Sequence, residues 1–417
     1  MSSNLTTKRD YIWNTIGVFA QNLISPLLLV VITRVNGIYD SGIFSFAFSV
    51  AIVFWAIAMW GGRTYQVSDI RKEFSSGSYV VVRLALGVVV LISAILFSVL
   101  NGYDPTKSTV IILLVVFKII ESSSDAVYGI LQSHERLDLV GKSLLYKTIG
   151  GFGLFVLIDV LSSDIALASL GIIIANLFVV CVYDLRKMKQ VSLVTTIGVF
   201  RSFSTSSLVA IIRRCFPAFI VIFLAMFSLN IPRYFIDMYH PDEIGVFGII
   251  AMPVTLVVLF MTFIMQPNTL KLSRLYQSGR YVDFDKTVKA IFTLTLIVGA
   301  AILLAAFAVG VPALRVIFGL DFSSYQFALI VIVVGGIFNA LVTVFINILV
   351  ITRNFTSQVI ILLSTNAVLV IISAYIVSRY GLYGGVILFT IMNIVQLLLF
   401  YVVYRHMLRK RINEKKN

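Results

Sequence analysis

Long apolar runs, separated by short polar segments, repeat along the whole chain. A helix that crosses a bilayer needs about 20 mostly apolar residues, and twelve runs reach roughly that length. The predicted membrane-spanning helices are residues 11–33, 41–62, 79–100, 108–132, 140–161, 164–183, 207–231, 243–265, 287–311, 324–350, 355–378 and 382–404. The pattern therefore predicts an all-α membrane protein with twelve transmembrane helices. The shortest polar break, at 162–164, predicts a tight turn between the fifth and sixth helices.

The helices fall into two matching halves, residues 1–200 and 201–417. The second helix of each half begins alike, with DSGIF at 40–44 and EIGVF at 243–247. Six helices in each half predict parallel repeats, related by an axis along the membrane normal. Transporters built from such repeats bind their substrate between the halves. We therefore expect two pseudo-symmetric six-helix bundles.

The composition supports lipid as the surrounding solvent. Hydrophobic residues make up 59% of the chain and charged residues 12%, whereas soluble domains have roughly 45–50% and about 25%. The net charge of +14 is explained by topology rather than by nucleic-acid binding. With the N-terminus inside, only five of the 33 Lys and Arg fall in outer segments and Lys118 lies within a helix, which leaves 27 inside. This bias predicts that both termini are cytoplasmic.

Three ionisable residues share one face of the fourth helix, Lys118, Glu121 and Asp125. The spacing i, i+3, i+7 places them on successive turns, and charges at membrane depth are costly. In one interpretation they line a polar cavity, where Lys118 meets an anionic headgroup and the carboxylates couple transport to an ion. In the other, Lys118 and Glu121 neutralise each other and stabilise helix packing.

Further polar residues are candidates for contacts with a substrate. Arg213 and Arg214 in the seventh helix and Lys147 in the fifth suit a phosphate, or their side chains extend to the membrane interface. Asn14 and Gln21 share a face of the first helix, where they contact a sugar or form interhelical hydrogen bonds.

Three prolines, Pro26, Pro217 and Pro253, fall inside the first, seventh and eighth helices. Proline removes a backbone hydrogen bond and bends a helix. These bends are either gating points or static kinks.

No residue set in the sequence has the pattern of a catalytic triad, a Walker loop or a metal site. We therefore expect that the chain is not an enzyme and needs no cofactor. Energy for transport would come from an H⁺ or Na⁺ gradient, or from removal of the product outside.

Three stretches are similar to segments of a known family: GILQSHER at 129–136, YGLYGG at 380–385 and SGIF at 41–44. Together with the two six-helix halves, they make the chain resemble the O-antigen flippases of the Wzx type. These belong to the multidrug/oligosaccharidyl-lipid/polysaccharide exporter superfamily, together with the multidrug and toxic-compound extrusion (MATE) transporters. The resemblance implies a MATE-like, V-shaped pair of bundles that works by alternating access through a cationic central cavity.

The implied cargo is an undecaprenyl-diphosphate-linked oligosaccharide, moved from the cytoplasmic to the periplasmic leaflet of a bacterial inner membrane. The implied partners are this lipid-linked oligosaccharide, membrane lipids, a polysaccharide polymerase and a chain-length regulator, with no nucleic acid. The similar lipid II flippases carry several arginines in the middle of their first two helices, and this chain has none there.

Two alternatives stay open. A cation-coupled multidrug antiporter of the same fold would use acidic cavity residues, such as Glu121 and Asp125. A polytopic O-antigen polymerase would have similar hydropathy, but it would need a long charged outer loop that the predicted helices leave no room for.

Overall fold

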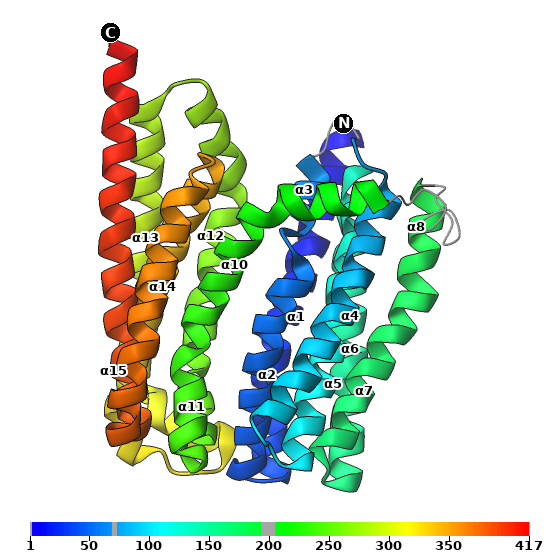
Figure 1. Cartoon of the computed structure of the whole chain (residues 1–417), viewed down its shortest axis with the longest axis vertical. Coiled ribbons are helices and arrows are strands. Elements are labelled where there is room, and N and C mark those ends of the chain that lie inside the picture. The colour runs from blue at the N-terminus through cyan, green and yellow to red at the C-terminus, as the bar shows by residue number, and fades with distance from the viewer. Residues whose placement is uncertain (1, 69–72, 193–204, 417) are drawn as a thin grey trace. The chain divides into compact units, whose positions relative to one another are not determined.

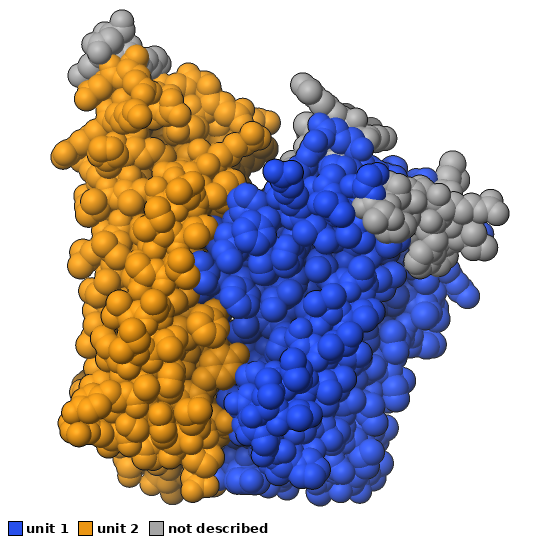
Figure 2. Space-filling view, viewed as in Figure 1, with its two compact units in different colours: residues 1–226 blue, residues 227–417 orange. Residues whose placement is uncertain are grey.

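The computed structural model describes residues 2–68, 73–192 and 205–416, and every regular element in these ranges is helical. The chain divides into two compact units, residues 1–226 and 227–417 (Figure 2). Within each unit, long helices lie side by side as a bundle (Figure 1).

The first unit contains α1 (Ser2–Val35), α2 (Ile38–Met59), α3 (Gly62–Ser68), α4 (Ser76–Leu100), α5 (Pro105–Ser133), α6 (Leu137–Ser162), α7 (Ile165–Val179), η1 (Val180–Asp184), α8 (Leu185–Ser192) and the first part of α10 (Thr205–Tyr239). The second unit contains the rest of α10, η2 (Pro241–Glu243), α11 (Ile244–Ile250), α12 (Met252–Gln277), α13 (Tyr281–Phe318), η3 (Ser323–Tyr325), α14 (Gln326–Ile351) and α15 (Phe355–Lys416).

Nine helices among the described residues are long and apolar enough to cross a membrane, or ten if α11 and α12 form one bent span. The chain is a multi-pass membrane protein. Two helices explain why this count is lower than the predicted twelve. α5 is 29 residues long but carries three charged residues in its middle. α15 has 62 residues and is broken at Gly381, where φ is 52°, so it can supply two spans. The number twelve stays a prediction.

The predicted tight turn between the fifth and sixth spans is confirmed. α6 ends at Ser162, and Ser163 adopts a left-handed conformation with φ of 50°. The Asp164 carboxylate then accepts hydrogen bonds from the backbone N–H of Ala166 and Leu167, at 2.8 and 3.1 Å. This capping satisfies donors that the start of α7 would otherwise leave without partners.

The described helices extend beyond the apolar runs from which they were predicted. α1 begins at Ser2 rather than residue 11, and α15 continues to Lys416 rather than ending at 404. The short α3 was not predicted. Hydropathy marks the part of a helix inside lipid, whereas backbone hydrogen bonding continues through polar residues with good helix propensity.

Glycines allow α1 and α6 to approach closely in the first unit. A Cβ on Gly17 would overlap the backbone of Gly141, and a Cβ on Gly141 would overlap the carbonyl oxygen of Trp13. Small residues at such crossings are typical of membrane bundles. α5 packs against α2, α3, α4 and α7, so the polar residues of α5 are surrounded by the other helices of this unit.

In the second unit, a carboxylate caps the distal part of α15. Glu243 Oε2 accepts a hydrogen bond from the backbone N–H of Leu382 at 2.5 Å. A Cβ at Gly381 would overlap this carboxylate, so glycine is required both for its positive φ and for space. The acidic residue of the EIGVF motif therefore supports the break in α15.

Candidate functional site

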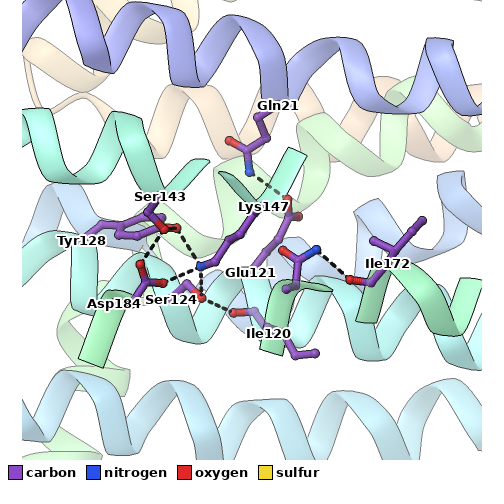
Figure 3. Close-up of polar contacts among 10 residues, drawn as sticks. Gln21, Ile120, Glu121, Ser124, Tyr128, Ser143, Lys147, Ile172 and Asp184 are labelled. Carbon is purple, nitrogen blue, oxygen red and sulfur yellow. Dashed lines mark hydrogen bonds and ion pairs between the residues drawn. The ribbon is translucent and has the colours of Figure 1, made fainter. Parts of the chain in front are cut away.

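A buried network of polar side chains surrounds Lys147 in the first unit (Figure 3). Lys147 Nζ donates to Ser124 Oγ and Tyr128 OH, both at 2.8 Å, and to Asp184 Oδ2 at 2.6 Å. All three N–H groups of the ammonium are therefore used. Ser143 Oγ donates to the second oxygen of Asp184 at 2.5 Å. We call these five residues the Lys147 network.

The hydroxyl hydrogens of the Lys147 network can be assigned from its contacts. Ser143 has a single hydroxyl hydrogen, and Asp184 Oδ1 accepts it. Tyr128 must then be the donor in its 2.8 Å contact with Ser143. Asp184 has no exposed surface and Lys147 is 6% exposed. A buried ion pair offsets its desolvation only when further hydrogen bonds satisfy the remaining atoms, and this network supplies them.

Asp184 reaches the Lys147 network from a π-helical turn. The backbone N–H of Leu185 bonds to the carbonyl of Val180, five residues earlier, in place of the usual four. Single π-helical turns inside α-helices occur frequently at functional sites. Here the wider turn ends at the residue that holds the only carboxylate of the network.

Glu121 lies beside the Lys147 network and connects α5 to α1. Gln21 Nε2 donates to Glu121 Oε1 at 2.7 Å, and Lys118 Nζ lies 2.5 Å from Oε2. Lys118 also lies over the rings of Phe48 and Phe117, 4.9 and 4.8 Å from their centroids. Lys118 and Glu121 therefore form the ion pair that the packing interpretation expects, and the role of either residue in transport stays a prediction.

A cavity of about 20 Å³ lies between Glu121 and Lys147. Its lining consists of Gln21, Ile24, Phe117, Glu121, Ser124, Tyr128, Leu144, Lys147, Thr148 and Asn176. This volume admits about one water molecule, so the cavity can hold a water or a small cation but not a diphosphate. Of Lys118, Glu121 and Asp125, only Glu121 is part of this lining.

Asp125 belongs to a separate cluster. Its carboxylate lies 3.7 Å from Arg63 Nε on α3 and 3.8 Å from Arg83 on α4. The buried Arg83 also donates to the carbonyl of Ala58 at 3.2 Å. The predicted face of α5 is therefore divided, since Glu121 contacts α1 and Asp125 contacts α3 and α4.

The predicted cationic residues of α10 lie apart from the Lys147 network. Arg213, Arg214 and Pro217 are exposed. Arg214 pairs with Glu73, and its guanidinium lies 5.1 Å from the ring centroid of Phe74. Within the described ranges, no hydrogen bond or ion pair joins the side chain of Arg213 or Arg214 to any residue of the Lys147 network. Their role in phosphate binding stays a prediction.

The remaining predicted residues occupy α1 and the α11–α12 break. Asn14 is half-buried, and its Oδ1 has no hydrogen-bond partner among the described residues. Pro26 lies inside α1. Pro253 is in the first turn of α12, just beyond the point where Pro241–Ile250 and Met252–Gln266 meet at 41°. This geometry is compatible with a gating bend or a static kink.

No protein-family model matches the chain. A capsular polysaccharide biosynthesis protein, CapF of Staphylococcus aureus, is 24% identical over 399 residues, which cover 93% of this chain and 98% of the relative. An inward-facing multidrug resistance MATE family transporter of the MOP superfamily aligns with a TM-score of 0.72 and 13% identity, over 96% of this chain and 99% of that one. The lipid II flippase MurJ, in an inward closed conformation, aligns with a TM-score of 0.70 and 14% identity. This alignment covers 94% of this chain and 87% of MurJ.

These alignments extend over nearly the whole of each chain, and they decide the fold. The chain has the MATE-type fold. The predicted resemblance to flippases of this superfamily is confirmed. The two solved structures are a transporter and a flippase.

Within this MATE-type fold, the sequence identified Lys147, Gln21 and Glu121 but missed the partners of Lys147. Asp184 follows directly on an apolar run and was assigned to the start of a polar segment. A usable signal existed, because an acidic residue at the end of one span and a lysine inside the preceding span suggest an ion pair.

Proposed function

We propose that the chain is a flippase for an undecaprenyl-diphosphate-linked oligosaccharide, a repeat unit of an O-antigen or capsular polysaccharide. It would move this cargo from the cytoplasmic to the periplasmic leaflet of a bacterial inner membrane. The observation that supports this most is the similarity to a capsular polysaccharide biosynthesis protein over 93% of the chain. The MATE-type fold supplies a scaffold on which transporters and a flippase are built.

The charge pairing in the first unit favours this cargo over an organic cation. Glu121 pairs with Lys118, and Asp184 pairs with Lys147. Asp125 lies between two arginines. An organic cation could pair with any of these three carboxylates only by displacing a cation of the protein, and the cavity beside Glu121 has room for no more than a water molecule or a small ion.

We further propose that Glu121 couples transport to an H⁺ or Na⁺ gradient. Its carboxylate lines a cavity large enough for one water molecule or a small cation. The network around Lys147 lies on the other side of this cavity. A polysaccharide polymerase and a chain-length regulator would act on the delivered repeat unit.

The test is deletion of the gene in its native host, followed by analysis of the side on which lipid-linked repeat units accumulate. For a flippase, they accumulate in the cytoplasmic leaflet, where a membrane-impermeant oxidant added to spheroplasts does not reach the sugars. Loss of a polymerase would instead leave single repeat units open to the oxidant. Increased drug susceptibility with normal polysaccharide would overturn the proposal in favour of the antiporter.

A further inference from the structure

A basic cleft of about 660 Å³ lies at one end of the second unit, where α12 meets α13. Its lining includes Leu270, Lys271, Arg274, Arg280, Asp283 and Lys286. Four of these residues are cationic and one is acidic. We call it the α12–α13 cleft.

Three of the four cations in the α12–α13 cleft lack a carboxylate partner among the described residues. Arg280 is neutralised, because its guanidinium lies 2.8 Å from Asp283 Oδ2. Lys271, Arg274 and Lys286 are exposed, and no carboxylate in the described ranges lies within 4.0 Å of them. Three like charges around one hollow repel one another, so an anion between them would be bound favourably.

The nearest acidic residue of α13 outside the cleft is already engaged. Asp285 lies 2.8 Å from Lys289 and 3.8 Å from Arg405, and it accepts a hydrogen bond from Tyr404 at 2.8 Å. Arg411 donates to Tyr276 OH at 3.2 Å. These contacts hold the basic end of α15 against the hairpin, as Figure 1 shows within this unit, and so add further positive charge to the same end.

The position of the cleft favours a lipid over a soluble anion. The mostly apolar run of α12 ends at Met265, and Lys271 follows about 9 Å further along the axis at 1.5 Å per residue. Leu270 in the lining and Val282 nearby expose 60% and 61% of their surface. Cations beside exposed apolar side chains, at the edge of the hydrocarbon, match the phosphate and acyl parts of one molecule.

We propose that the α12–α13 cleft binds the phosphate headgroup of an anionic phospholipid from the surrounding leaflet. Lys271 and Arg274 lie one turn apart on α12 and contact the phosphate from one side, and Lys286 on α13 contacts it from the other. Leu270 packs against the acyl chain. On the predicted topology, this is the cytoplasmic leaflet. Such binding needs no transport activity, so it stands whether or not the chain is a flippase.

The test measures lipid binding to the purified full-length protein in detergent by native mass spectrometry. The probes are phosphatidylglycerol, phosphatidylcholine with the same acyl chains, and inorganic diphosphate. The variant K271Q/R274Q removes one Lys and one Arg from the cleft. The matched control R409Q/K410Q removes one Lys and one Arg from exposed positions on α15, outside the lining.

We expect the cleft variant to raise the Kd for phosphatidylglycerol by about tenfold or more, and the control variant to change it less than twofold. Wild-type protein should bind phosphatidylglycerol at least about tenfold more tightly than phosphatidylcholine. Equal losses in the two variants, or equal binding of the two lipids, would overturn the proposal. So would full displacement of phosphatidylglycerol by an equal concentration of diphosphate, which would indicate a soluble anion.

A second measurement needs no variant. Photoactivatable phosphatidylglycerol, carrying its reactive group near the phosphate, should label wild-type protein in native membranes within residues 266–287. Labelling confined to other segments would contradict the assignment.

Discussion

Lys147 is a buried cation, and its burial depends on the ion pair with Asp184. Each ion alone would bear a desolvation penalty of several kcal/mol. Ser124 and Tyr128 accept hydrogen bonds from the two remaining N–H groups of Lys147, and Ser143 donates to the second oxygen of Asp184. The sequence makes Lys147 a candidate for phosphate contact or for extension to the membrane interface, and in this conformation all its donors are used within the protein. A substrate phosphate could bind it only by replacing one of its three acceptors, Ser124, Tyr128 or Asp184.

The first prediction concerns this pair. We expect Lys147→Met to lower the free energy of unfolding by about 3–5 kcal/mol, because it leaves Asp184 buried without a counter-charge. The double variant Lys147→Met/Asp184→Leu should recover most of that loss, since both charges are then absent. Unfolding in sodium dodecyl sulfate titrations, followed by circular dichroism, measures both.

Lys189→Met is the matched control, because Lys189 is exposed at the end of α8. If Lys147→Met were as stable as this control, the pair would not be buried as described. A stable double variant without transport would show that the pair also has a role beyond folding.

Glu121→Gln tests ion coupling. Glutamine can still accept a hydrogen bond from Gln21, but it cannot bind a proton or attract a cation as a carboxylate does. We expect transport driven by an imposed H⁺ or Na⁺ gradient in proteoliposomes to fall by about tenfold or more. Exchange without a gradient should change less. Glu414→Gln, at an exposed position on α15, should behave as wild type, and a gradient response in Glu121→Gln equal to that control would remove Glu121 from the coupling step.

At the scale of elements, the crossing of α1 and α6 positions the residues around the small cavity. Gln21 on α1 and Lys147 on α6 both line it, and the two helices touch through Gly17 and Gly141. Separating the helices would therefore weaken the contact of Gln21 with Glu121.

Gly141→Ala is expected to destabilise the protein by about 1–3 kcal/mol, as overpacking of a close-packed interior does. Gly153→Ala is the matched control on the same helix, because a Cβ there would meet no atom within 4 Å. Thermal unfolding, followed by fluorescence-detected size-exclusion chromatography, should show a lower midpoint for Gly141→Ala and an unchanged one for Gly153→Ala. Equal midpoints would contradict the close contact of α1 and α6.

The elements that the sequence predicted well are those with a single physical cause. A membrane span needs length and apolar composition, and both can be read locally, as the turn at 162–164 shows. The π-helical turn before Asp184 and the break at Gly381 depend on partners far along the chain. Asp184 meets a lysine 37 residues earlier, and Gly381 accommodates a carboxylate from residue 243. No local pattern contains those contacts.

The same limit applied to the candidate site. Glu121 and Asp125 share a face by spacing, yet Glu121 meets Lys118 of α5 itself, whereas Asp125 meets arginines of α3 and α4. Lys147 was identified as a charge out of place in an apolar run. The hydroxyl partners of Lys147 could not be identified from the sequence, since serine and tyrosine are ordinary residues in a membrane helix.

At the scale of the whole molecule, the path of the chain across the membrane follows from the break in α15. The segment before Gly381 has 26 residues, about 39 Å at 1.5 Å per residue, which is enough to cross the hydrocarbon. Arg379 beside the break and Asn354 before α15 should therefore lie on opposite sides of the membrane.

Full-length sandwich fusions measure this directly. With the N-terminus inside, alkaline phosphatase inserted after Arg379 should be active, because it folds only outside the cytoplasm, whereas a fusion after Asn354 should be inactive. Green fluorescent protein at the same sites should give the reverse. Gly102, between α4 and α5, and Arg136, between α5 and α6, serve as the outer and inner references. An inactive phosphatase after Arg379 with an active one after Gly102 would mean that the first part of α15 turns back within the membrane, and the predicted count of twelve spans with both ends inside would be wrong.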